Sequence, residues 1–262
     1  MSNLSMAVRD SATMLRRDAR HSQRNIAMTV TGILVPVVML TLFNYFFGGA
    51  IGAGVATTHG GSYINFLLPG ILIMTIGSGC ETTALNLCMD MSEGVITRFR
   101  TMAIARSSVL TGQVVGSLIR TVISIVVVLG IGLLMGFRTA AGSMAWVEVF
   151  GVVVLFTLGI TWMGVLFGLI GRTPAGANSL ALLFTLLAFT SSAFVPLDSI
   201  APGVRWFAEY QPFTPVIETV RGLLLGTPVS TSTTLLAVGW SIVFILAGYL
   251  GARAVYNRDP VR

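Results

Sequence analysis

The chain has 262 residues, of which 54% are hydrophobic and 10% are charged, and its formal net charge is +6. A soluble domain cannot hide that much apolar surface. The composition, with a mean hydropathy of +0.86, therefore excludes a soluble globular protein and predicts an integral membrane protein. The length allows about six spans with short loops, but no additional soluble domain of ordinary size.

Residues 1–25 predict an amphipathic helix that lies along the membrane surface. Apolar and small residues recur at spacings of three and four from Leu4 to Ala19, and the arginines of this segment lie off that stripe. The segment is not expected to be a secretory signal, because the apolar run that follows it is too long.

Six apolar runs predict six transmembrane helices. The first, 26–47, would be about 33 Å long as a helix, which matches a bilayer core of about 30 Å, and Pro36 predicts a kink within it. The other runs are 63–87, 118–137, 146–170, 178–195 and 235–256. We therefore expect an all-α, polytopic membrane protein in which residues 1–262 form a single transmembrane domain, with spans one to five in 26–195.

The distribution of arginine, which supplies all sixteen basic residues, predicts that both termini are cytoplasmic. With the N-terminus inside, twelve arginines fall in inner segments, whereas Arg138, Arg205 and Arg221 fall in outer segments. The sixteenth, Arg120, lies near the inner edge of the third span, where a long side chain can reach the interface. The loop between the second and third spans is then cytoplasmic, and segment 196–232 is an outer connection.

The cytoplasmic loop 88–110 carries an unusually charged stretch, 92–106, for so apolar a chain. Drawn as a helix, it is amphipathic: Val95, Ile96, Phe99, Met102 and Ala103 share one face, and Thr97, Arg98, Arg100 and Thr101 share the other. Such a helix at a membrane surface indicates a docking place for another protein. The alternative is an ordinary solvated loop that merely follows the positive-inside pattern.

The outer segment 196–232 is rich in apolar residues, and five prolines break it into short pieces. It predicts two short helices that dip into the outer leaflet. Glu218 and Arg221 lie three residues apart on the second of them and can form an ion pair. That pair either shapes an exit gate or keeps the re-entrant hairpin folded.

Two stretches of the sequence carry a family resemblance. Residues 93–110 read Glu-Gly-Val-Ile-Thr-Arg-Phe-Arg-Thr-Met-Ala-Ile-Ala-Arg-Ser-Ser-Val-Leu. The second stretch has Phe-Val-Pro-Leu-Asp at 194–198, Trp206, Gln-Pro-Phe-Thr-Pro at 211–215 and Glu-Thr-Val-Arg-Gly-Leu-Leu-Leu-Gly at 218–226. Together they resemble the permease subunits of type-2 ABC transporters, particularly the drug- and lipid-exporting branch typified by daunorubicin-resistance membrane proteins.

The resemblance implies a coupling helix in the first stretch, which docks on an ATP-binding subunit, and a re-entrant hairpin in the second. The implied docking residues are Glu93, Ile96, Arg98, Phe99, Arg100 and Met102. Phe99 and Met102 would be apolar anchors, the arginines would set the register, and Glu93 would favour the helix dipole. Ala103 replaces the Pro that is usual in the family, so no helix break is expected there.

The implied activity is ATP-driven export of a lipophilic or amphipathic compound, such as a drug, antibiotic, glycolipid or lipid, across the bacterial plasma membrane. The chain has no Lys and therefore no Gly-x-x-x-x-Gly-Lys-Ser/Thr motif, so ATP and Mg are expected on the partner and no cofactor on this chain. We expect a transport subunit rather than an enzyme. Its partners would be two ATP-binding subunits, a second permease copy or close relative and membrane lipids, but no nucleic acid.

Glu81 is an intramembrane charge in the second span. A carboxylate at the centre of a span costs about 2.5–3.5 kcal/mol, so Glu81 should face the bundle or a cavity. It would line the translocation path or bind a cationic substrate. Alternatively, it lies near the inner interface and pairs with Arg120 or Arg100. Glu81, Glu218 and Arg221 are thus the candidate path or gate residues.

Three further patterns lead to predictions about single positions or pairs of residues. Glu148 is expected at the interface, near the outer end of the fourth span. Cys80 and Cys88 are about 12 Å apart along one helix, so they cannot form a disulfide. Gly164 and Gly168 have a Gly-x-x-x-Gly spacing, which is weak evidence of a dimer face.

Two other functional classes stay open. In a proton-coupled secondary transporter, Glu81 would carry the proton, although the chain shows no clear inverted repeat. In a non-transporting membrane scaffold or sensor, the cytoplasmic loop would bind a partner and no cargo would move.

Overall fold

A computed structural model describes residues 26–49, 62–92 and 106–258, and over these ranges the chain is helical and contains no strand. This confirms the all-α fold. The elements in chain order are α2 (Ile26–Leu42), the π-helix η1 (Phe43–Phe47), α4 (Tyr63–Ser92), α6 (Arg106–Leu134), α7 (Ser143–Gly171), α8 (Pro174–Phe189), the 3-10 helix η2 (Leu197–Ser199), α9 (Pro202–Tyr210), α10 (Phe213–Leu225) and α11 (Thr231–Arg258).

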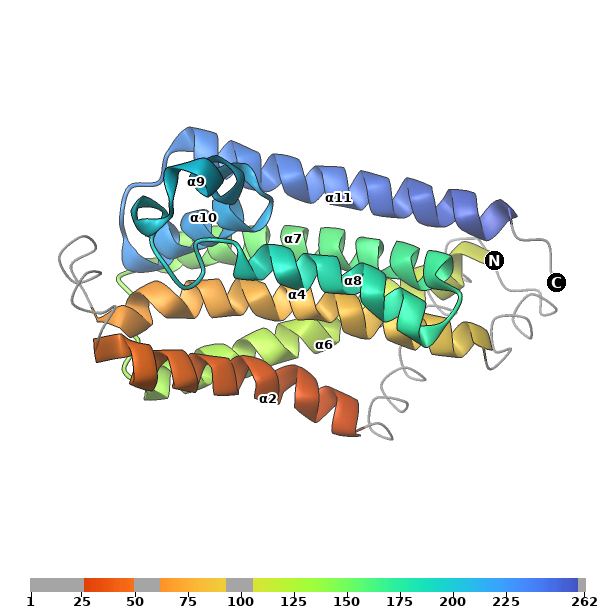
Figure 1. The fold of residues 1–262 in the computed structure, drawn as a ribbon, viewed down its shortest axis with the longest axis horizontal. Coiled ribbons are helices and arrows are strands. Elements are labelled where there is room, and N and C mark those ends of the chain that lie inside the picture. The colour runs from red at the N-terminus through yellow and green to blue at the C-terminus, as the bar shows by residue number, and fades with distance from the viewer. Residues whose placement is uncertain (1–25, 50–61, 93–105, 259–262) are drawn as a thin grey trace.

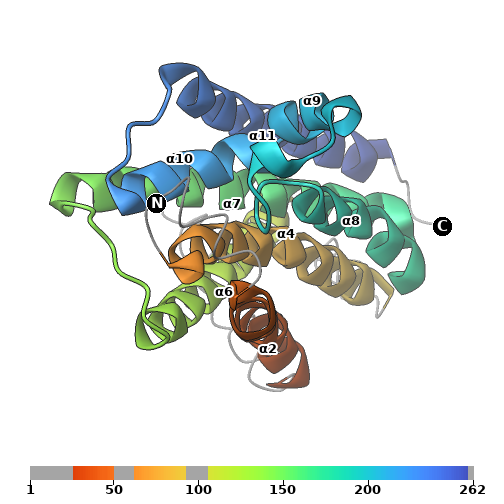
Figure 2. The same cartoon turned by 60° about the vertical axis from the view of Figure 1, so that its left-hand side comes forward.

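The long helices lie side by side in an elongated bundle, and the short helices α9 and α10 lie together at one end of it (Figure 1). We call this the hairpin end. Helix α4 runs through the centre, where it packs against α2, α6, α7, α8 and α10 (Figure 2). Its half nearest the hairpin end is almost entirely buried, with Leu67, Leu68, Ile71 and Ile73 at its core. Helix α4 is therefore the axis on which the other elements are assembled.

Small residues allow α4 and α7 to approach each other closely. A Cβ atom added to Gly164 would lie 2.9 Å from the carbonyl oxygen of Cys80, and one added to Gly168 would lie 2.8 Å from that of Ala84. Such distances leave no room for any side chain. The Gly-x-x-x-Gly face is thus used within the chain, between α4 and α7.

Among the described residues, four helices are long and apolar enough to cross a membrane: Tyr63–Ser92, Thr111–Leu134, Ser143–Gly171 and Thr231–Val255. The helices at the first and fifth predicted spans are shorter apolar segments, Gly32–Phe47 and Pro174–Phe189. A helix therefore occupies the place of each predicted span, while six complete membrane crossings remain a prediction.

Several predicted boundaries differ from the structure. The second span, predicted at 63–87, continues as α4 to Ser92, so the loop predicted at 88–110 is helical at 88–92 and again from Arg106. The apolar run predicts the fifth span at 178–195, but α8 begins at Pro174 and ends at Phe189. The Thr173 hydroxyl accepts a hydrogen bond from the Gly176 N–H at 3.1 Å and Pro174 fits the first turn, so the helix starts earlier. The third predicted span begins at 118, whereas α6 begins at Arg106, because the polar residues that precede the apolar run continue the helix.

Candidate functional site

The predicted docking residues Glu93, Ile96, Arg98, Phe99, Arg100 and Met102 lie in 93–105, outside the described residues. The docking face therefore stays a prediction, as does the interfacial helix of residues 1–25. The structure does describe both flanks of the loop, since α4 ends at Ser92 and α6 begins at Arg106. Both flanks lie at the end of the bundle opposite the hairpin (Figure 1), which we call the coupling end.

Among the described residues, the arginines of the predicted outer segments lie at the opposite end of the bundle from Arg172 and Arg253, as the sequence predicts. Arg138 follows α6, Arg205 lies in α9 and Arg221 lies in α10, all at the hairpin end. Arg172 follows α7, and Arg253 lies in the last turns of α11, both toward the coupling end. This partition agrees with the positive-inside pattern if the coupling end is cytoplasmic.

Glu81 lies deeper in its helix than the sequence indicates. Because α4 continues to Ser92, Glu81 is about 16 Å, or roughly three turns, from the helix end. Its side chain is half-buried, and its carboxylate accepts a hydrogen bond from the Thr185 hydroxyl of α8. Arg120, a predicted alternative partner, donates to Ser117 Oγ at 2.9 Å on its own helix. The depth of Glu81 and its contact with α8 favour a place inside the bundle.

Glu81 belongs to a polar stripe on the coupling half of α4. The stripe consists of half-buried polar side chains: Ser78, Thr82, Asn86 and Asp90 recur every four residues, and Glu81 lies one turn after Ser78, at the edge of the stripe away from Asp90. The half of α4 nearest the hairpin is apolar by contrast and packed on all sides. Sequence reasoning selected Glu81 alone, although the spacing of the four other residues was readable. Polar groups at such positions face protein or a water-filled space rather than lipid tails.

The outer segment forms the two short helices that the sequence predicts. Helix α10 is buried against α11, α7 and α4. It ends at Leu225 and is followed by Gly226, whose φ of +68° is a left-handed conformation suited to glycine. Helix α9 is exposed, and its Arg205 forms a 2.7 Å ion pair with Asp198, whose side chain is 79% exposed. The two helices of the hairpin thus have opposite environments.

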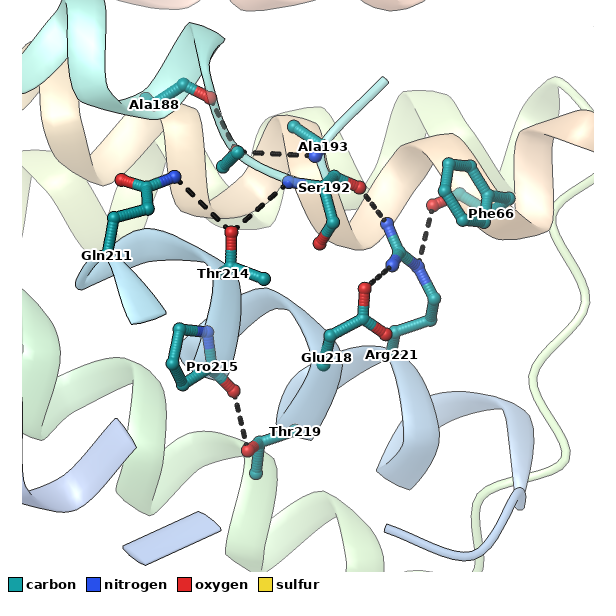
Figure 3. Close-up of polar contacts among 11 residues, drawn as sticks. Phe66, Ala188, Ser192, Ala193, Gln211, Thr214, Pro215, Glu218, Thr219 and Arg221 are labelled. Atoms are coloured by element: carbon teal, nitrogen blue, oxygen red, sulfur yellow. Dashed lines mark hydrogen bonds and ion pairs between the residues drawn. The ribbon is translucent and has the colours of Figure 1, made fainter. Parts of the chain in front are cut away.

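Arg221 is the most strongly bound charged side chain of the hairpin, and it is 3% exposed. Its Nη1 pairs with Glu218 one turn away, which confirms the predicted ion pair. Its Nε donates to the carbonyl of Phe66 at 3.1 Å, and its Nη2 donates to that of Ser192 at 2.8 Å (Figure 3). The guanidinium carbon also lies 3.8 Å from the centre of the Phe66 ring. One side chain therefore joins α10 to α4 and to the segment after α8.

That segment, 190–195, is a junction at the hairpin end. A Cβ atom on Gly70 of α4 would lie 2.6 Å from the Cα of Ala193, so the two backbones touch. Tyr63 donates from its hydroxyl to the carbonyl of Phe194 at 3.2 Å. The Phe194 ring stacks on Phe43 of η1, with centroids 4.2 Å apart. The junction therefore contacts η1, α4 and α10 at once.

Two buried polar atoms near Arg221 have no hydrogen-bond partner among the described residues: Ser192 Oγ and Gln211 Oε1. Their neighbours are satisfied, since the Ser192 N–H and Gln211 Nε2 both donate to Thr214 Oγ1 at 3.3 Å (Figure 3). A buried polar atom without a partner costs free energy. The cluster is therefore held by Thr214 and Arg221 rather than by the Ser192 hydroxyl.

Replacing Ser192 with Ala is expected to leave the melting temperature unchanged or slightly raised, because it removes an unpaired hydroxyl and no hydrogen bond. Thr214→Ala is expected to lower the melting temperature. The Ser192 N–H and Gln211 Nε2 then lose their acceptor, which costs about 1–3 kcal/mol of folding free energy for each donor. Thermal unfolding of the purified permease in detergent would compare the two variants. A larger loss for Ser192→Ala than for Thr214→Ala would contradict this description of the cluster.

Comparison with known proteins agrees with this architecture. Residues 10–225 match the family described as ABC-2 type transporter. The chain belongs to this family. It is 26% identical to the daunorubicin resistance ABC transporter permease protein DrrB1 of Streptomyces coeruleorubidus over 86% of this chain and 75% of that one. It is also 26% identical to a probable doxorubicin resistance ABC transporter permease protein DrrC of Mycobacterium tuberculosis, over 79% of this chain and 73% of that one.

A third relative, the inner membrane transport permease YadH of Escherichia coli, is 24% identical over 88% of this chain and 90% of its own. Relatives named as permeases, together with the apolar helices, identify the chain as the membrane permease of an ABC exporter. It is a multi-pass protein of the bacterial inner membrane. Membership of the family implies partnership with ABC ATPase subunits.

Proposed function

We propose that this chain forms the translocation domain of an ATP-driven exporter of a lipophilic or amphipathic compound, together with a second permease copy or a close relative and two ATP-binding subunits. The observation that carries the proposal is the family match over residues 10–225, which includes both the coupling loop and the hairpin. Relatives named for daunorubicin and doxorubicin resistance support a drug or another amphipathic compound as cargo.

The energy would enter at the coupling end. The ATP-binding subunits would hold ATP and Mg, and the amphipathic face of loop 88–110 would dock on them through Phe99 and Met102. Since the loop connects α4 directly to α6, a movement of the docked helix would displace both the central helix α4 and its neighbour α6. This assignment makes the coupling end cytoplasmic and both termini cytoplasmic, in agreement with the partition of arginines.

The cargo would pass along the polar stripe of α4. Glu81 supports this role because a half-buried carboxylate in the middle of the helix requires a hydrated or polar environment. Glu218 and Arg221 would act at the far end, where the hairpin would close the path toward the outside. The whole chain would form a single transmembrane domain in which the shorter helices at 26–47 and 174–189 complete six spans.

Transport into vesicles tests this function. The permease and its cognate ATP-binding subunit are reconstituted, and doxorubicin fluorescence reports movement of the probe. We expect uptake into inverted vesicles that needs ATP and stops with vanadate. Movement that follows a pH gradient and ignores ATP would instead support a secondary transporter with Glu81 as proton carrier. A complex that binds the ATPase but moves neither doxorubicin nor a fluorescent lipid would support a scaffold.

A further inference from the structure

Helix α4 is physically connected to both functional ends of the molecule. With 30 residues it is about 45 Å long, and its last residue, Ser92, directly precedes 93–105, the part of the coupling loop that holds the predicted docking residues. Its first turns lie at the hairpin end, beside α10 (Figure 1). A displacement of the coupling loop therefore acts on a helix that extends to the opposite face of the bundle.

At the hairpin end, α4 and α10 are joined by a buried charge rather than by apolar packing alone. Arg221 of α10 donates to the Phe66 carbonyl and lies against the Phe66 ring (Figure 3). Pro69 follows in the same helix and lacks an N–H, so the carbonyl of Asn65, the neighbour of Phe66, has no helical donor, and the Phe66 carbonyl can accept from Arg221 with its second lone pair.

Separation of α10 from α4 would deprive the buried guanidinium of the Phe66 carbonyl and ring, which is unfavourable although Glu218 and the Ser192 carbonyl stay bound. A second tie runs in parallel through the connection between α6 and α7. There the Arg138 N–H donates to Asn65 Oδ1 at 3.1 Å, and the Thr139 hydroxyl donates to the Leu224 carbonyl at 2.7 Å. The first turn of α4 and the last turn of α10 are thereby held to the same loop.

We propose that Arg221 is a positioning residue that makes α10 follow the hairpin end of α4, so that a movement started at the coupling loop reaches the outer hairpin. This inference rests on the proposed function, in which ATP-binding subunits drive that loop. Helix α9 has no equivalent role, because its Arg205–Asp198 pair is exposed and lies within the hairpin itself. The hairpin is thus moved through α10 and not through α9.

A single reporter cysteine tests the proposal without knowledge of the cargo. Thr227→Cys places a thiol at the exposed position after α10, while the native Cys80 and Cys88 are buried. In the complex with the cognate ATP-binding subunit, trapping with ATP and vanadate is expected to change the maleimide labelling rate several-fold. In the Arg221→Lys background the change should fall below twofold, while ATP hydrolysis stays within twofold of its original rate.

Arg205→Lys is the matched control, since it makes the same substitution in an exposed pair of the same hairpin, and it should keep the several-fold change. If Arg221→Lys does not fold, Phe66→Leu, which removes the ring against the guanidinium and keeps the Glu218 ion pair, should at least halve the change. An undiminished change in the Arg221→Lys protein would overturn the proposal. A complex that hydrolyses ATP without any change in labelling would also overturn it, whereas absence of ATP hydrolysis would reject the proposed function instead.

Discussion

Replacement of Gly164 by Leu is expected to abolish most of the folded permease. A Cβ atom at this position already lies 2.9 Å from the Cys80 carbonyl and 3.0 Å from the Thr83 Cβ, so four added carbons must push α7 away from α4. Overpacking of a core costs about 1–3 kcal/mol where the neighbours can shift, and more where the obstacle is backbone. That is a large part of the roughly 5–15 kcal/mol that holds a typical protein folded.

Gly151→Leu is the control, because Gly151 lies on the same helix, is exposed, and has no atom within 4 Å of the place that a Cβ would occupy. We expect this variant to keep the yield and the melting temperature of the parent, since Leu is also a better helix former than Gly. The monodisperse peak in size-exclusion chromatography and the melting temperature measure both variants. Equal yields would show that α4 and α7 do not approach as closely as the structure indicates.

The helical positions were readable from the sequence because each is a long apolar run, and neither composition nor length allowed another fold class. The two short helices of the outer segment were readable as well, since prolines mark their first turns. The first residues of α6 and α8 could not be predicted from the sequence. Hydropathy shows where a helix becomes apolar, but it does not show where the backbone hydrogen bonds of the helix begin. A side-chain cap such as Thr173 decides the latter.

The ion pair of Glu218 with Arg221 could be predicted because it is local, with a spacing of three residues on one helix. The contacts of Arg221 with Phe66 and Ser192 could not, since they bring together residues 155 and 29 positions apart and their acceptors are backbone carbonyls. Gly164 and Gly168 pose the same difficulty. Their spacing indicates a close helix contact, but only the packed structure shows that the partner is α4 of the same chain.

Phe99→Asp is expected to abolish co-purification of the permease with its ATP-binding subunit, while membrane insertion and yield stay the same. Phe99 lies on the apolar face of the predicted coupling helix, together with Ile96 and Met102. A carboxylate in the middle of such a face would be buried without a partner, and truncation of a central aromatic anchor alone can cost about 2 kcal/mol or more, roughly a thirtyfold loss of affinity. Pull-down through a tag on the permease measures the bound ATPase.

Thr101→Asp is the matched control, since it adds the same charge to the opposite, polar face of that helix, beside Arg100. The variant should retain the ATPase subunit, because an exposed carboxylate near an arginine is well solvated. If both variants lose the subunit, the charge of the loop rather than its apolar face determines binding, and the role assigned to Phe99 is wrong. If Phe99→Asp retains the ATPase subunit, that subunit must act on another part of the permease. The proposal that a movement of the coupling loop reaches Arg221 through α4 would then have no basis.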